Sequence, residues 1–310
     1  MRTLARALVR LDRGAQLALA TVVRVSGSAP RHEGAHMIVA ADGSTEGTIG
    51  GGRVELEVTR EAAEVAGGAA ARRVTHHLVR DLAMCCGGSM ELYIEPLAPS
   101  REAIAAALEL RRARRGGALV TPLCGQPKRV VELETPPRRP ALDGDELVEP
   151  IRPPDRLFVI GCGHVGRALG SIAASLGFEI VACDDGDTGA LDEPPAWATR
   201  VVPSFDVADI EREVGALGDG DFVAIATRDH ATDERVLERL LTNDSLSYLG
   251  LIGSRRKIER FRRRLEAKQV ATPARWERLY APIGLDIGAE TPEEIAVAIA
   301  AQLVAVARSA

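Results

Sequence analysis

The sequence of 310 residues is poor in aromatic side chains and has no large excess of charge of either sign. Only 3% of the residues are Phe, Trp or Tyr, too few for the row of stacking rings that single-stranded nucleic-acid binders use. With 39 basic and 44 acidic residues the net charge is −5, whereas general nucleic-acid binders are usually basic. We therefore expect no nucleic-acid partner.

Cysteines and long apolar runs are also scarce. Five cysteines are too few for a disulfide scaffold, and their odd number leaves one unpaired, which favours a reducing compartment. The longest apolar run, 295–307, is shorter than the roughly 18–20 residues of a membrane span and is broken by Gln302. Arg6, Arg10 and Arg13 interrupt the N-terminal segment, so it does not resemble a signal peptide. These features predict a cytoplasmic protein without a membrane span.

Prolines divide the sequence into two parts. Six prolines fall within residues 135–155, where neither a helix interior nor a central strand accommodates them. We therefore predict a semi-rigid linker over 135–155. It would join an N-terminal α+β domain over 1–134 to a second domain over 156–310.

The two predicted domains differ in the order of their elements. In the first, strands are expected at 17–25, 37–39 and 91–97, helices at 53–65 and 101–114, and a hairpin joining 119–123 to 129–133. In the second, strands are expected at 157–160, 178–183, 200–202, 222–226 and 248–252, and helices at 165–176, 207–216, 232–241, 255–268 and 292–308. Regular alternation is typical of right-handed βαβ units. The fold class is therefore α/β: a small α+β domain followed by a Rossmann-like, doubly wound parallel sheet.

A glycine-rich turn follows the first predicted strand of the second domain. Gly161, Gly163 and Gly166 form G-x-G-x-x-G directly before a predicted helix, the pattern that lets a diphosphate approach a helix N-terminus. Asp184 follows Gly161 at about the spacing of a ribose-binding acid, which favours NAD or another unphosphorylated ribose. In the alternative interpretation the glycines only make the turn, and His164 is an ordinary loop residue.

Further polar residues follow the fourth and fifth strands of this domain. Asp229, His230 and Asp233 form either an acid–base or metal site, or a helix cap beside a surface histidine. Ser254 and Arg255 begin a helix whose residues 255–268 include eight basic side chains and two glutamates. Cations at a helix N-terminus oppose its dipole unless an anion is present, so a phosphate site is one interpretation. A solvated basic face, or one that docks an acidic partner, is the other.

Three segments of the first domain carry candidate binding chemistry. Residues 27–31 end in Arg31, and residues 48–55 place Gly50, Gly51 and Gly52 before Arg53. Glycines before a helix, with arginines nearby, indicate an anion site, although a tight turn with surface arginines is the alternative. The third segment contains Cys85, Cys86, Gly87 and Gly88. A thiolate there could contact a soft metal or carry sulfur, or both cysteines could be structural.

Seven stretches give the sequence its resemblance to the XdhC/CoxI family, the xanthine dehydrogenase accessory proteins. In chain order they are ATVVRVSGSAPRHEGAHM, GTIGGGRVE, CCGGSMELYIEP, FVIGCGHVGRAL, TRDHATDERVL, YLGLIGSRRK and APIGLDIGAETPEEIAVAIAAQL. They span residues 20–303, which is nearly the whole chain. Many relatives carry cysteine where this sequence has Arg53, so no sulfur or metal role is expected at that position.

The resemblance implies a factor that binds molybdenum cofactor (molybdopterin), supports its sulfuration with a cysteine desulfurase and delivers it to a xanthine dehydrogenase-type molybdenum hydroxylase. It implies a homodimeric chaperone rather than a turnover enzyme. The alternatives are an NAD-dependent oxidoreductase, with His230 as acid or base, and an interaction module without a small ligand. The candidate cofactor-binding residues are Arg31, Gly50, Gly51, Gly52, Arg53, Cys85, Cys86, Gly87, Gly88, Gly161, Gly163, His164, Gly166, Asp184, His230, Ser254 and Arg255. Cys85 and Cys86 are also the candidate ligands to molybdenum.

Overall fold

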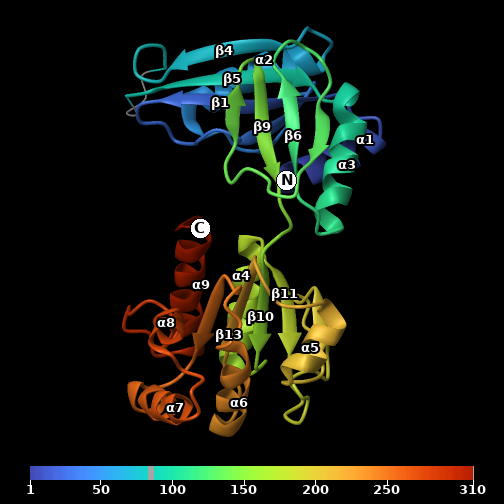
Figure 1. Cartoon of the computed structure of the whole chain (residues 1–310). Helices are drawn as coiled ribbons and strands as arrows, with labels where there is room; N and C mark the ends of the chain where they lie inside the picture. The colour runs from blue at the N-terminus through green and yellow to red at the C-terminus, as the bar shows by residue number, and fades with distance from the viewer. Residues whose placement is uncertain (83–86, 310) are drawn as a thin grey trace. The chain divides into compact units, whose positions relative to one another are not determined.

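The computed structural model describes residues 1–82 and 87–309 (Figure 1). The chain forms two compact units, Met1–Pro153 and Pro154–Ala310, and each is described by itself. Among the described residues, no helix combines the length and the apolar character needed to cross a bilayer.

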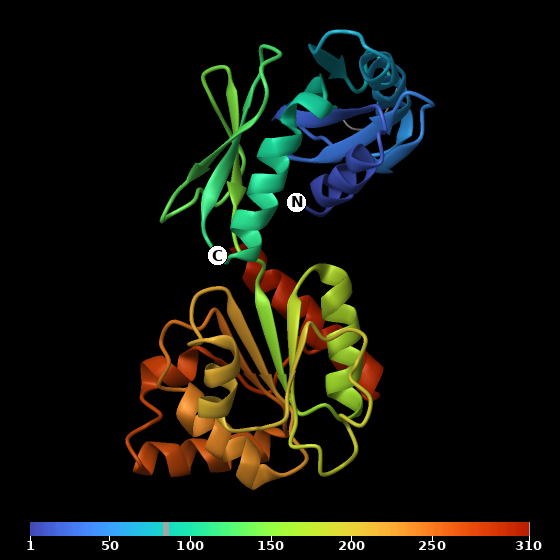
Figure 2. The ribbon, with the colours of Figure 1, turned by 90° about the vertical axis from the view of Figure 1, so that its right-hand side faces the viewer.

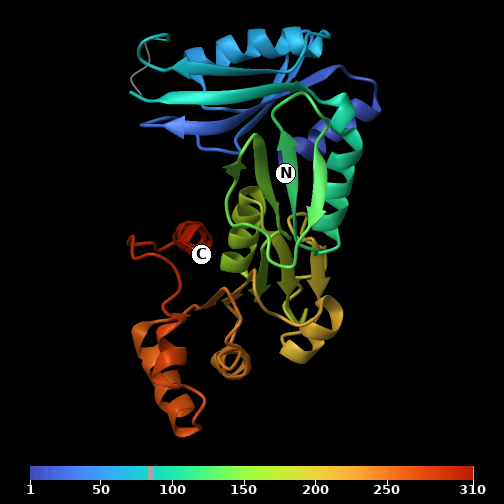
Figure 3. The same ribbon diagram turned by 45° about the horizontal axis from the view of Figure 1, so that its top comes forward.

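The first unit is built around a five-stranded antiparallel sheet in the order β3-β2-β1-β5-β4. Its strands are β1 (Leu17–Ser26), β2 (His36–Ala40), β3 (Thr45–Gly47), β4 (Arg72–His77) and β5 (Ser89–Pro96). The central strand β1 is apolar on both faces because helices cover both. Ala18, Ala20 and Val22 pack toward α2 (Gly52–Ala66), which Figure 3 shows lying along one face. Leu17 and Leu19 pack toward α1 (Arg2–Asp12) and α3 (Arg101–Arg112).

The same unit contains a second, four-stranded sheet in the order β7-β6-β9-β8. Its strands are β6 (Gly117–Pro122), β7 (Arg129–Glu132), β8 (Ala141–Asp143) and β9 (Glu146–Ile151), and the short 3₁₀ helix η1 (Ala98–Ser100) precedes α3. The predicted β6–β7 hairpin is confirmed.

The linker predicted over 135–155 is wrong, because β8 and β9 lie within it. β9 pairs with β6 over its whole length but with β8 only over Glu146–Val148. Pro150 therefore has a strand on one side only, and a free strand edge tolerates a residue without an N–H group. Five of the six prolines lie outside strands, so a high proline content did not exclude sheet structure here.

The second unit is a six-stranded parallel sheet, and it confirms the predicted α/β class. Its strands are β10 (Arg156–Ile160), β11 (Glu179–Cys183), β12 (Arg200–Val202), β13 (Asp221–Ile225), β14 (Tyr248–Leu251) and β15 (Leu279–Tyr280), in the order β12-β11-β10-β13-β14-β15. In chain order this is 3-2-1-4-5-6, the arrangement of Rossmann domains, whose ligands bind where the strand order reverses. The reversal lies between β10 and β13.

Helices cover both faces of this sheet, as Figure 2 shows. Leu157 and Val159 of β10 pack against α4 (His164–Leu176) and α9 (Pro292–Ser309). Phe158 and Ile160 face the opposite layer of α5 (Val207–Val214), α6 (His230–Leu240) and α7 (Arg255–Ala267). The short helix α8 (Pro273–Glu277) precedes β15. Because both faces are covered, the strands read as continuous apolar runs rather than alternating ones.

Candidate functional site

The glycine loop between β10 and α4 is shaped by two close backbone approaches. A Cβ on Gly161 would lie 2.2 Å from the carbonyl oxygen of Ala226, and Gly161 has a φ of +108°. A Cβ on Gly166 would lie 2.0 Å from the carbonyl oxygen of Gly161. By contrast, nothing lies within 4 Å of a Cβ built on Gly163, the residue that caps α4. The loop thus brings α4 against the end of β10. The N–H groups in the first turn of α4 remain available to a ligand.

This loop opens onto a cavity of about 710 Å³ at the carboxyl ends of the strands. Its volume lies in the range of small-molecule sites. Of the predicted residues, Gly161, Gly163, His164 and Asp184 line the cavity. Other parts of its wall come from loops that follow the neighbouring strands: Thr188, Phe205, Thr227, Arg228 and Ile252.

Asp184 is buried and already holds the glycine loop. Its Oδ2 accepts a hydrogen bond from the backbone N–H of Cys162 at 2.8 Å, and its Oδ1 accepts one from Gly186 at 3.1 Å. This carboxylate therefore fastens the loop to the end of β11. The Cys162 thiol points into the protein beside the carbonyl of Cys183, and burial, with Asp184 nearby, raises the pKa of that thiol to about 12. Cys162 is thus a packed residue of the core.

Asp233 and His230 do not form the acid–base or metal pair that the sequence suggested. Asp233 is buried, accepts hydrogen bonds from the Thr227 backbone N–H and hydroxyl, and forms an ion pair with Lys257. His230 is exposed, packs edge-on against Phe261 and does not line the cavity. Within the described residues, no three His, Cys, Asp or Glu side chains come together as a metal site.

The basic start of α7 is also less available than its sequence suggests. Ser254 caps the helix by accepting a hydrogen bond from the Lys257 N–H, and the Lys257 ammonium is buried against Asp233. Arg255 extends into solvent and forms a loose ion pair with Asp286, at 3.8 Å. Further along α7, glutamates of α6 and of α7 itself pair with Arg262, Arg263, Arg264 and Lys268. Most of the expected positive face is therefore neutralised locally.

In the first unit, the structure brings together the three glycine-bearing segments. A Cβ on Gly50 would lie 2.3 Å from Cγ of Pro30 and 3.6 Å from Cγ of Arg31. A Cβ on Gly88 would lie 2.4 Å and 2.5 Å from the carbonyl oxygens of Ser26 and Ser28. Segments far apart in sequence thus meet at the end of β1. Cys85 and Cys86, the predicted ligands to molybdenum, lie outside the described residues.

The glycine triplet before α2 does not offer all of its amides to a ligand. The Oε2 atom of Glu55 accepts hydrogen bonds from the Thr48 hydroxyl and the N–H groups of Ile49 and Gly51, and Thr48 Oγ1 accepts one from Gly50. Partial burial by itself would raise the pKa of Glu55, but these hydrogen bonds lower it overall. The predicted anion cradle is therefore largely filled by the chain's own carboxylate.

Cationic groups remain at the rim of this region. Arg31 and Arg53 are exposed, and neither makes a hydrogen bond or ion pair with any residue that the structure describes. Gly52 and Arg53 form the first turn of α2, whose N–H groups have no partner within the helix. Beside this loop the chain therefore presents positive charge, whereas the amides of Gly50 and Gly51 are engaged within the loop.

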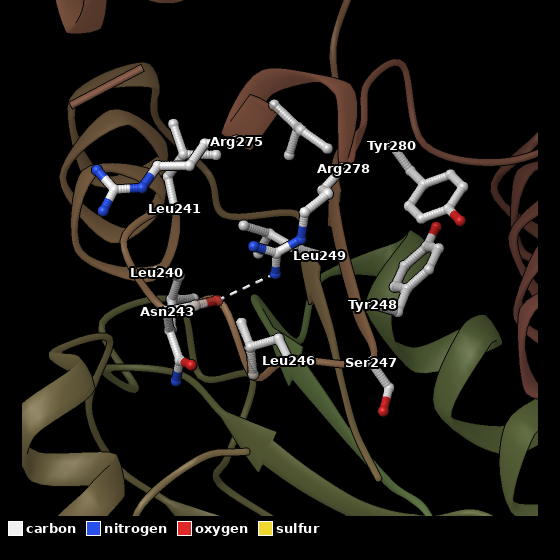
Figure 4. A pocket seen from close by; sticks show the side chains of 11 residues that line it. Leu240, Leu241, Asn243, Leu246, Ser247, Tyr248, Leu249, Arg275, Arg278 and Tyr280 are labelled. Carbon is white, nitrogen blue, oxygen red and sulfur yellow. Dashed lines mark hydrogen bonds between the residues drawn. The ribbon is translucent and has the colours of Figure 1, made fainter. Parts of the chain in front are cut away.

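A smaller cavity in the second unit contains none of the predicted residues. Figure 4 shows its wall, which includes Arg275, Arg278, Tyr248 and Tyr280. Arg278 donates to the backbone oxygen of Asn243 at 3.3 Å and forms an ion pair with Asp244 at 2.5 Å. The volume is about 110 Å³, and its nearest cations are already paired, so it is a poor candidate for a ligand site.

Sequence reasoning missed three residues with defined structural roles. Glu55 is part of the GTIGGGRVE stretch. A carboxylate seven residues after Thr48, in the first turn of the following helix, is a signal for a residue that anchors the loop. Lys257 was grouped with surface cations, and only its position on the inner face of α7 distinguishes it. Arg228 carried no signal, because its role depends on β11 and β13 ending at the same edge of the sheet.

Comparison with known families agrees with this architecture. The family model for the XdhC Rossmann domain matches residues 157–303, and the model for the XdhC and CoxI family matches residues 10–77. The chain belongs to the XdhC and CoxI family. The resemblance stated from the seven sequence stretches is thereby confirmed.

Individual relatives cover the chain to different extents. YqeB of Escherichia coli (strain K12) is 32% identical over 96% of this chain, which spans only 45% of the length of YqeB. A Bacillus subtilis (strain 168) protein, named as one of the probable subunits of a xanthine dehydrogenase, is 24% identical over 92% of both chains. The E. coli "Molybdenum cofactor insertion chaperone PaoD" is 30% identical over 56% of this chain and 54% of its own length.

A solved structure resembles the whole fold. A crystal structure described as a xanthine dehydrogenase from Bacillus halodurans superposes with a TM-score of 0.82 at 26% sequence identity. The match covers 99% of this chain and 96% of the other. The arrangement of an α+β unit followed by a Rossmann unit is thus shared along both chains.

Proposed function

We propose that this protein is an accessory factor that binds molybdenum cofactor and supports the maturation of a molybdenum hydroxylase. The observation that carries this proposal is the meeting of three glycine-bearing segments in the first unit, with Arg31 and Arg53 unpaired at its rim among the residues that the structure describes. Similarity to a protein named as a molybdenum cofactor insertion chaperone and to proteins named as xanthine dehydrogenases supports it.

The chemistry of the rim fits one part of this cargo. Molybdenum cofactor carries a phosphate, and planar guanidinium groups bind phosphate oxygens in bidentate fashion. Arg31 and Arg53 would supply these contacts together with the first-turn N–H groups of α2. The glycine loop itself would shape the surface, because Glu55 and Thr48 occupy its amides.

Finer parts of the function rest on the sequence resemblance. We propose that the factor supports sulfuration of the cofactor with a cysteine desulfurase, and that it delivers the cofactor to a xanthine dehydrogenase-type hydroxylase. Cys85 or Cys86 would be the soft ligand to molybdenum, next to Gly87 and Gly88. A homodimer and a cytoplasmic location remain proposals of the same kind.

The test is anaerobic binding. The purified protein is mixed with molybdenum cofactor and gel-filtered, and molybdenum and pterin are measured per chain. We expect near-stoichiometric retention by the wild type, weakened about tenfold by Arg31→Ala or Arg53→Ala through loss of a charge-assisted phosphate contact. Arg60→Ala is the control, because Arg60 lies further along α2 and pairs with Glu57.

Each part of the proposal has a result that would count against it. If the wild type retains no cofactor, the chaperone function fails. If both arginine variants bind as tightly as the wild type, the function survives but the phosphate is held elsewhere. A Cys85→Ser/Cys86→Ser variant with unchanged affinity would remove the thiolate ligand.

The second candidate function is an NAD-dependent oxidoreductase, favoured by the 710 Å³ cavity beside the glycine loop. His230, its predicted acid or base, does not line that cavity, so the role would pass to His164. Turnover of NADH with a small carbonyl substrate, lost in His164→Ala, would support an enzyme. If the chain binds neither cofactor nor nucleotide, the interaction module becomes the better explanation.

A further inference from the structure

Arg228 bridges two strand ends that flank the glycine loop. It follows β13, and its guanidinium reaches the segment that follows β11. Nη1 donates to Asp185 Oδ1 at 2.5 Å, and Nη2 donates to Asp187 Oδ2 at 2.8 Å. β10, which leads into the glycine loop, lies between β11 and β13 in the sheet. The bridge therefore crosses the sheet where its strand order reverses.

The arginine of this bridge forms part of the cavity wall. Arg228 and Phe205 both line the 710 Å³ cavity, and the guanidinium lies 5.9 Å from the centre of the Phe205 ring. Asp185 and Asp187 are not among the lining residues. Arg228 thus both lines the cavity and holds the two carboxylates.

The acid at the usual ribose position has another task in this chain. Both oxygens of Asp184 accept backbone N–H groups, one from the glycine loop and one from Gly186. In dinucleotide-binding Rossmann domains, an acid at the end of the second strand hydrogen-bonds the ribose hydroxyls. Here the next carboxylates along the chain, Asp185 and Asp187, are the acceptors less committed to the backbone.

We propose that this cavity binds a nucleoside diphosphate whose ribose carries a free 2′-hydroxyl, and that Asp185 and Asp187, the two partners of Arg228, determine that selectivity. The three side chains carry a net charge of −1 when ionised, which opposes a 2′-phosphate. Removing both carboxylates leaves the Arg228 cation alone, which favours a 2′-phosphate. This site is separate from the cofactor site proposed in the first unit, so either can fail without the other.

The bridge is suited to being opened by a ligand. The side chains of Arg228 and Asp185 are 40% and 29% exposed, and exposed ion pairs of this kind contribute little to stability. The hydrogen bond from Arg228 lowers the pKa of Asp185, so the carboxylate is an ionised acceptor at neutral pH. A ribose hydroxyl can therefore replace the arginine without disturbing the fold.

The test is equilibrium binding of NAD⁺ and NADP⁺, which differ only in the 2′-phosphate, to the full-length protein by calorimetry. We expect the wild type to prefer NAD⁺ by about tenfold, and Asp185→Asn/Asp187→Asn to abolish or reverse that preference. Arg228→Gln should keep the preference for NAD⁺, because it leaves both carboxylates. Asp209→Asn, which changes an aspartate that pairs with Arg212 on α5, is the control and should leave the ratio unchanged.

Three outcomes would overturn the proposal. The first is that neither nucleotide binds the wild type. The second is equal binding of both. The third is a preference that survives in the double aspartate variant or disappears in Arg228→Gln. Circular dichroism and thermal unfolding of each variant ensure that a lost preference is not a lost fold.

Discussion

Lys257 and Asp233 form a buried ion pair between the first turns of α7 and α6. The Lys257 ammonium also donates to the Ile252 carbonyl at 2.9 Å, and Asp233 accepts from the Thr227 N–H at 3.0 Å. Ile252 follows β14 and Thr227 follows β13, and both line the 710 Å³ cavity. A single ion pair thus joins two of the family's sequence stretches and fixes the cavity wall.

Replacing Lys257 should destabilise the second unit strongly. Lys257→Met leaves the buried Asp233 carboxylate without its counter-charge, and removal of one partner of a buried pair costs about 3–5 kcal/mol. Urea unfolding measures this difference. The neighbouring Arg256→Ala changes an exposed cation and should stay within about 0.5 kcal/mol of the wild type. Equal stability of the two variants would show that the pair contributes nothing.

Two glycines of the loop should differ in their tolerance of alanine. Gly166→Ala places a methyl group 2.0 Å from the Gly161 carbonyl oxygen, so α4 has to move away from the strand, at a cost of about 1–3 kcal/mol. Gly163→Ala meets nothing within 4 Å and should change the melting temperature little. Thermal unfolding of both variants checks this contrast, and a Gly166→Ala protein as stable as the wild type would contradict it.

Glu55 should make the stability of the first unit depend on pH. Its pKa is lowered in the folded protein, so its contribution is present above the ordinary value of 4.5 and is lost as the pH falls through the folded value. We expect Glu55→Gln to be less stable by roughly 1–2 kcal/mol near neutral pH, with the difference shrinking at pH values below 4.5. Urea unfolding across this range tests it, with Glu57→Gln as the control. A constant difference would rule out the ionised form as the anchor.

The thiols should fall into two reactivity classes. In a Cys85→Ser/Cys86→Ser protein, three cysteines remain, of which Cys124 is exposed and Cys162 and Cys183 are buried. Burial raises the pKa of Cys162 and Cys183, so neither forms a thiolate near neutral pH. An aromatic disulfide reagent should therefore titrate one thiol in the native protein and all three after unfolding. Rapid reaction of two or three native thiols would show that the glycine loop opens.

Much of the second unit was predictable because its signals are local. Apolar runs such as 157–160 alternate with helical segments, and G-x-G-x-x-G marks the turn after the first strand. β15 was missed because Leu279–Tyr280 is only two residues long and pairs on one side only. The register of the parallel strands has no local signal, and so the Arg228 bridge could not be foreseen.

The first unit was harder to predict, for two physical reasons. β4 consists of Arg72–His77, whose side chains alternate between partly buried and exposed without an apolar face. β8 and β9 lie among prolines, and only the narrow pairing with β8 makes Pro150 acceptable. The site residues share this difficulty: the sequence placed Gly50 and Arg31 in separate motifs, and only the fold brings them into contact.

The central position of β10 affects how the chain can fold during synthesis. β11 follows β10 and covers one of its edges, but the other edge stays open until β13 is made, which happens only after α5. Until then an apolar strand presents unpaired backbone groups, which is a template for aggregation. A chain that stalls or is cleaved between Val202 and Asp221 would therefore be a target for chaperones or proteases rather than a half-functional Rossmann domain.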